Sequence, residues 1–361
     1  MAADVVSNVL IKVHQSLHGY SDGHRQLACS VKFSQDDAKL VLTMSDVSGS
    51  GVAAEGSSYL TGYPLKDLGM YALAKTWSAL EMPRPGCVWT HTIYIEYADL
   101  ATVIAPSRLA RLFSRPESSS WSIYGVPTSM SVLDCDEPEP GLSLQDEKWL
   151  SAVLNTLYES PRERVAAKRD FPVSVEALTL RIWDQQWPRL RRSFRFCTLT
   201  TKDRSMPGAV FDLQVLPSNE SSGRMRHAGV LEATSSSDAS QPDWLRTLLE
   251  DARQPNLDGL RDTLRMLGAD ILGGREAMST LCAFHRAISG STSPSDLHQA
   301  IAMLDGQGLL SRSDVARTLV VEHILSAVGD ADAIAVTFLW NNWRFIDTQR
   351  LRNSGAKLAT T

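Results

Sequence analysis

Short stretches in which apolar and β-branched residues alternate with polar ones occupy residues 9–113, with turn residues between them. The stretches 9–14 and 25–31 predict an antiparallel pair of strands joined by a connection rich in glycine and aspartate. Further strands are predicted at 71–77 and 88–97, the second with β-branched or aromatic residues at nearly every position. This spacing predicts a largely antiparallel sheet.

Helix signals lie among these strands. Ser34, followed by Asp36 and Asp37, is typical of an N-cap and an acidic first turn, so we expect a helix through about Met44 that ends before the glycine-rich stretch 48–51. A second helix, interrupted at a proline, is predicted at 99–113. Mixed strands and helices with short connections predict the α+β class.

The rest of the chain divides by composition. Acidic residues and two prolines at 134–141 predict a domain boundary, and the serine-rich stretch 218–241 predicts a linker. Between them, helices are expected at 142–157, 162–169 and 173–187, and strands at 192–200 and 209–216. Beyond residue 242, leucines at helical spacing predict helices throughout, including 278–288, 297–304, 314–328 and 332–343. The predicted regions are an α+β N-terminal domain at 1–137, a mixed middle region at 142–217, the linker, and an all-helical domain at 242–361.

Composition limits the classes of function. With 43% hydrophobic and 21% charged residues the chain is typical of a globular protein, and a net charge of -5 argues against a surface devoted to nucleic acid. The five cysteines are scattered singly, so neither a zinc ribbon nor a disulfide framework is indicated. The sequence carries no secretory signal pattern and no long apolar run, which predicts a cytoplasmic protein without membrane contact.

The run HQSLHGYSDGH, residues 14–24, holds three of the eight histidines. His14 and His18 have the spacing of a helical zinc motif, but the glycines in the run disfavour a helix, and the run is predicted as the loop between the first two strands. A loop-borne cluster of His18, Asp22 and His24, completed by His91 from the opposite strand, is the arrangement that would support a metal-dependent hydrolase. Turn chemistry accounts for these residues without a metal, and histidines near strand ends are often simply hydrogen-bonded, so we assign no metal or cofactor.

Residues 181–196 interleave arginines with aromatics. Such a mixture can stack bases and neutralise phosphates, which makes nucleic-acid sensing an alternative function. Aromatic residues four apart on a helix, or two apart on a strand, are also how a core is built. The residues concerned are Trp183, Trp187, Arg189, Arg191, Arg192 and Arg195.

Signatures of common catalytic sites are absent from the sequence. No G-x-S-x-G nucleophile elbow occurs, and the glycine-rich stretch 48–56 lacks the G-K-[ST] ending of a phosphate-binding loop. Any nucleoside triphosphatase activity connected with this chain must therefore come from another polypeptide.

Four stretches taken together resemble a known family. HQSLHGYSDGH (14–24), YLTGYP (59–64), YALAKTW (71–77) and EMPRPGCVWTH (81–91) are similar in order and content to the N-terminal domain of bacterial GTPase-associated adaptor proteins of multi-component conflict, or antiphage defence, systems. WDQQWPRLRRSFRF (183–196) is similar to the family's middle region.

The resemblance implies a non-enzymatic adaptor that works beside a dedicated GTPase and an effector, and it assigns no catalytic residues. The proline-flanked Arg84 is a candidate for an arginine finger supplied in trans to that GTPase. The metal-dependent hydrolase and the nucleic-acid sensor remain the alternatives.

Overall fold

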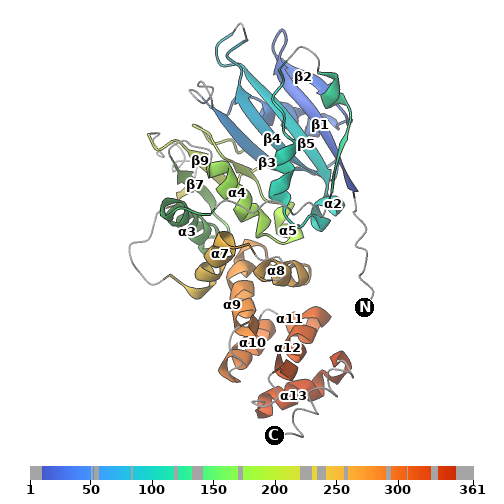
Figure 1. Ribbon diagram of the computed structural model, residues 1–361, viewed down its shortest axis with the longest axis vertical. Coiled ribbons are helices and arrows are strands. Elements are labelled where there is room, and N and C mark those ends of the chain that lie inside the picture. The colour runs from blue at the N-terminus through green and yellow to red at the C-terminus, as the bar shows by residue number, and fades with distance from the viewer. Residues whose placement is uncertain are drawn as a thin grey trace. The chain divides into compact units, whose positions relative to one another are not determined.

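The computed structural model describes residues 10–49, 52, 57–82, 84–117, 121–131, 141–169, 174–219, 230–233, 241–255, 259–289, 294–306, 308–326 and 332–346. The chain forms two compact units, Met1–Ser237 and Asp238–Thr361 (Figure 1). Residues 134–140 of the predicted boundary and most of the predicted linker lie outside the described residues. Residues 230–232, within that linker, form a strand.

The first unit is built on a sheet that comprises ten strands among the described residues. Its first section is antiparallel, in the order β3–β4–β5–β1–β2, and a short strand, β6, pairs with the start of β1. This section confirms the antiparallel sheet predicted from the sequence. Its strands are β1 (Leu10–Tyr20), β2 (His24–Cys29), β3 (Ser58–Leu65), β4 (Met70–Ser78), β5 (Val88–Glu96) and β6 (Thr128–Ser131).

The same sheet continues into the middle of the chain. Strand β8 pairs antiparallel with β3, and from there the sheet runs parallel through β9, β7 and β10 (Figure 1). The regions predicted as N-terminal domain and middle region therefore share one sheet, within the α+β class that was predicted. The added strands are β7 (Arg164–Lys168), β8 (Phe196–Cys197), β9 (Leu213–Leu216) and β10 (Val230–Glu232).

Two sequence-based expectations were wrong. The basic stretch 162–169, expected to be helical, contains strand β7, because its three central residues are buried one after another between the neighbouring parallel strands. The histidine run is not a loop: β1 extends through Tyr20, and only residues 21–23 turn the chain, with positive φ at Asp22 (55°) and Gly23 (125°). Positive φ at two successive turn residues is typical of a tight hairpin.

Helices cover both faces of the antiparallel section. Helix α1 begins at the predicted N-cap, Ser34, whose hydroxyl accepts a hydrogen bond from the Asp37 amide, and it packs on one face through Val41 and Met44. We call this the α1 face. On the opposite face, which we call the α4 face, Trp183 stacks on Tyr71 with ring centroids 4.9 Å apart. The helices of this unit are α1 (Gln35–Ser45), α2 (Tyr97–Thr102), α3 (Leu144–Glu159), α4 (Ser174–Asp184) and α5 (Pro188–Arg191), with 3-10 turns η1 (Pro106–Leu112) and η2 (Ser122–Gly125).

The second unit is helical over its described residues, as predicted. Leucines at helical spacing in α7 and α8 are buried, and between the two helices the Arg261 guanidinium pairs with the Asp251 carboxylate at 3.0 Å. None of the helices in the described ranges combines the length and apolar character needed to cross a membrane. The helices are α7 (Asp243–Arg253), α8 (Leu260–Gly268), α9 (Met278–Ser289), α10 (Pro294–Gly306), α11 (Leu309–Arg312), α12 (Asp314–Ser326) and α13 (Ala333–Asn341), with 3-10 turns η3 (Arg275–Ala277) and η5 (Trp343–Phe345).

Candidate functional site

The strand register separates the histidines that a metal site would have to bring together. His18 lies opposite Thr90 on β5, whereas His91 lies opposite Leu17. Cross-strand partners share a face of the sheet and neighbours along a strand alternate, so His14 and His18 occupy the α1 face and His91 the α4 face. His91 therefore does not meet the histidines of the run, as the metal-dependent alternative would require. Across the described residues, no cluster of His, Cys, Asp or Glu side chains could hold a metal ion.

His91 is a structural link on the α4 face. Its Nδ1 accepts a hydrogen bond from the Ser114 amide at 3.2 Å, so its Nε2 carries the proton and donates to the Gln15 side-chain oxygen at 2.9 Å. The Gln15 amide in turn donates to the Ile123 and Val126 carbonyls at 2.8 and 2.7 Å. Burial lowers the pKa of His91 to about 4. The neutral imidazole therefore holds the segment after η1 against the sheet.

His18 and His24 stack on the α1 face, with ring centroids 6.2 Å apart. Burial, together with the neighbouring His24, lowers the pKa of His18 to about 3, and burial also lowers the pKa of His24. The Ser45 hydroxyl donates to the Leu42 carbonyl, so its oxygen accepts from His24 Nε2 at 2.9 Å. Both rings are thus neutral at pH 7.

The other two members of the predicted cluster lie apart from this pair. The Asp22 carboxylate is exposed in the hairpin turn, where it lies 3.8 Å from the Arg25 guanidinium. His14 Nδ1 donates to the Ser30 carbonyl at 3.1 Å. His14 Nδ1 also lies 3.2 Å from the Ser30 hydroxyl, which accepts a hydrogen bond from the Gln15 backbone amide at 2.8 Å. These contacts tie β1 to the residue that follows β2.

Gly19, within the histidine run, lies against an aromatic ring. A Cβ atom added at this position would approach the Trp89 ring to 2.3 Å. We expect Gly19→Ala to lower the free energy of unfolding by about 1–3 kcal/mol, because the ring must move out of a packed core. Urea unfolding followed by tryptophan fluorescence measures this. The matched control is Gly125→Ala, because a Cβ at position 125 would meet nothing within 4 Å. Its urea unfolding midpoint should equal that of the wild-type chain. Equal midpoints for Gly19→Ala and Gly125→Ala would contradict the argument.

The arginine- and tryptophan-rich segment is largely core. The Trp183 and Trp187 side chains are buried, and Trp183 Nε1 donates to the Arg191 carbonyl at 3.0 Å. The buried Arg191 guanidinium donates to the Val103 carbonyl at 2.7 Å and to the Asp184 carbonyl at 3.2 Å. These side chains tie α4, α5 and the end of α2 together, so they do not form a base-stacking surface.

The remaining candidate arginines are more accessible. Arg192 is exposed and lies over the Tyr97 ring at 5.7 Å, and Arg189 is half-buried. The Arg195 backbone amide donates to the Asp212 carboxylate at 2.7 Å. Arg84 is exposed in the turn between β4 and β5, and its guanidinium lies 5.8 Å from the centroid of the Tyr20 ring.

Sequence analysis missed Arg204, a buried cation at the C-terminal end of α1. Its guanidinium donates to the Thr43, Met44 and Asp46 carbonyls at 3.1–3.2 Å. The Ser45 carbonyl accepts from the Thr90 hydroxyl at 2.6 Å. A helix leaves its last carbonyls without partners and carries a partial negative charge there, so Arg204 both satisfies these acceptors and complements the helix dipole.

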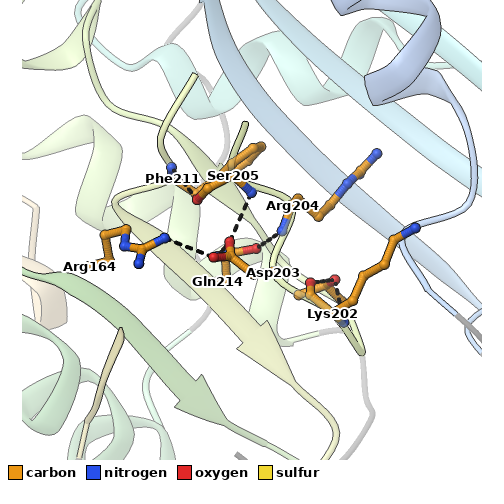
Figure 2. Close-up of polar contacts among 8 residues, drawn as sticks. Arg164, Lys202, Asp203, Arg204, Ser205, Phe211 and Gln214 are labelled. Atoms are coloured by element: carbon orange, nitrogen blue, oxygen red, sulfur yellow. Dashed lines mark hydrogen bonds and ion pairs between the residues drawn. The ribbon is translucent and has the colours of Figure 1, made fainter. Parts of the chain in front are cut away.

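A partly buried network positions the loop that carries Arg204 (Figure 2). The Asp203 carboxylate pairs with Arg164 at 2.8 Å, and it accepts from the Ser205 amide and the Gln214 side chain, each at 2.8 Å. The Gln214 side-chain oxygen accepts from the Arg204 amide at 2.8 Å. The loop thus bonds to β7 and β9 on one side, while the Arg204 side chain extends away from this network in Figure 2.

Beside this loop lies a cleft of about 450 Å³, bordered by the end of α1. It presents a neutral imidazole, a carboxylate and an ammonium group, supplied by His24, Asp46 and Lys202. Groups of both charges and both hydrogen-bonding types can hold a small polar molecule, but they do not form a nucleophile–base pair. Only His24 was singled out from the sequence.

A comparison with known protein families finds a match in the N-terminal part of the chain. No curated protein matches the chain. Residues 12–113, which run from β1 through η1 and include the histidine run and Arg84, match the family model described as GTPase-associated protein 1, N-terminal domain type 1. This match supports the likeness to GTPase-associated proteins for that part of the chain.

Proposed function

We propose that the protein is an adaptor that binds a separate GTPase and links it to an effector in a bacterial conflict, or antiphage defence, system. The observation that carries the proposal is the match of residues 12–113 to a GTPase-associated domain. The absence of a phosphate-binding-loop motif from the sequence agrees with it, because the GTPase must then be another chain. Both partners act with the adaptor in the cytoplasm.

The described geometry favours binding over catalysis. The histidines of the matched region lie on two faces of one sheet, and two of them are buried and neutral. In this role they stabilise the scaffold, and the exposed side chains at the strand ends contact the partner.

Co-purification tests the adaptor. The full chain is expressed with the GTPase encoded beside it, and the complex is isolated in GDP, in a non-hydrolysable GTP analogue and without nucleotide. We expect a stoichiometric complex in at least one state. An unrelated GTPase at the same concentration is the control. Failure to bind the neighbouring GTPase in all three conditions, with both proteins folded, would overturn the proposal.

A further inference from the structure

Backbone hydrogen bonds hold the described residues of the turn between β4 and β5, at one end of the sheet. The Ala79 amide donates to the Cys87 carbonyl at 2.9 Å, and the Met82 amide donates back to the Ala79 carbonyl at 3.1 Å. Gly86 has a φ of +82°, which glycine adopts without strain, and the ring of Pro85 restricts its own backbone. These contacts restrain the described residues that carry Arg84, 79–82 and 84–87.

Arg84 has no carboxylate partner among the described residues. Glu81, on the same turn, is already engaged: its carboxylate accepts from the Arg115 guanidinium and from Trp89 Nε1, each at 2.7 Å. In the neighbouring hairpin, Arg25 lies near the Asp22 carboxylate and donates to the Ser21 hydroxyl at 2.7 Å. The Arg84 guanidinium is thus available to bind an external anion.

The Tyr20 ring supports the Arg84 guanidinium while leaving it exposed. Stacking on an aromatic face uses the plane of the guanidinium, so the N–H groups along its edge remain available. A supported arginine also loses less side-chain entropy when it binds. Its planar fork suits the oxygens of a phosphate group.

We propose that Arg84 acts in trans in the nucleotide site of the partner GTPase, where it donates hydrogen bonds to the γ-phosphate. This inference rests on the proposed function. In the reaction a water oxygen bonds to the γ-phosphorus, the bond from that phosphorus to the β–γ bridging oxygen breaks, and the water proton passes to the released phosphate. Arg84 is chemically unchanged and stabilises the charge that develops on the phosphoryl oxygens.

Single-turnover GTP hydrolysis by the purified GTPase, with and without the full chain, tests the proposal. We expect the wild-type chain to accelerate hydrolysis, and Arg84→Ala and Arg84→Lys to lower the accelerated rate at least ~100-fold. The matched control is Arg192→Ala, because Arg192 is likewise exposed and stacked on a tyrosine; this variant should keep the wild-type rate.

A binding measurement separates this role from simple attachment. GDP with aluminium fluoride mimics the transferring phosphoryl group, so it should tighten the complex of the wild-type chain but not that of Arg84→Ala, whereas both should bind equally in GDP alone. A wild-type chain that binds without accelerating hydrolysis, or an Arg84→Ala chain that accelerates it fully, would overturn the inference and leave the adaptor intact. Loss of all binding by the wild-type chain would instead overturn the adaptor itself.

Discussion

Arg204→Met is expected to lower the free energy of unfolding of the first unit by about 3–5 kcal/mol. The substitution keeps much of the side-chain volume but leaves carbonyl groups at the end of α1 without their donor. Each buried acceptor that loses its partner costs about 1–3 kcal/mol, and removal of the buried cation's desolvation cost offsets part of the sum. Urea unfolding monitored by far-ultraviolet circular dichroism measures the change.

Two further variants test that reasoning. Arg204→Lys retains the charge but not the planar fork, so its stability should fall between those of wild type and Arg204→Met. Arg25→Met removes an exposed arginine and should change the free energy of unfolding by less than about 0.5 kcal/mol. A loss for Arg204→Met no greater than that for Arg25→Met would show that Arg204 is not the cap of α1.

Acidification from pH 7 to pH 5 is expected to destabilise the first unit by about 4 kcal/mol through His18 and His91. In the unfolded chain both bind a proton near pH 6.5, but burial lowers the folded-state pKa of His18 to about 3 and that of His91 to about 4. The stabilisation is fully present above pH 6.5 and falls with pH, because the unfolded state binds more protons. Each histidine contributes about 2 kcal/mol of the loss by pH 5.

The pH dependence of the unfolding midpoint in urea isolates these two side chains. His18→Gln and His91→Gln should each flatten the dependence between pH 7 and pH 5, and the double variant should flatten it most. Glutamine at position 91 retains one donor and one acceptor for the Gln15 and Ser114 contacts. A double variant that keeps the wild-type slope would show that other groups control acid unfolding.

The sequence predicted those helices and strands whose formation is determined by residues within the element or next to it. The strand at 88–97 was predicted because β-branched or aromatic side chains occupy nearly every position, and helix α1 was predicted from its N-cap. The stretch 71–77, also predicted as a strand, lies within β4. Strand β3 was missed because it contains glycine and proline. Its Gly62 is required by packing, since a Cβ there would lie 2.4 Å from both the Phe196 ring and the Tyr71 hydroxyl.

Local sequence patterns could not predict which side chains contact the end of α1. Arg204 lies about 160 residues along the chain from the helix end that it caps, as the numbering of its partners shows. Spacing and periodicity report contacts within a few residues, so they cannot assign this role. The separation of His91 from His18 depends likewise on the register of β1 against β5, which alternation within a single strand does not determine.

The pairing of β3 with β8 also sets the timing of folding during synthesis. The outer edge of β3 acquires its partner only when residues 196 and 197 have been made, and the parallel strand β9 ends at residue 216. A nascent chain that has emerged only through the matched region, residues 12–113, therefore presents an unpaired strand edge to its surroundings. Long-range pairings of this kind form late. Ribosome-bound chains with residue 113 clear of the ribosome but residue 196 not yet made should consequently depend on chaperones, whereas those with residue 216 well clear of the ribosome should not.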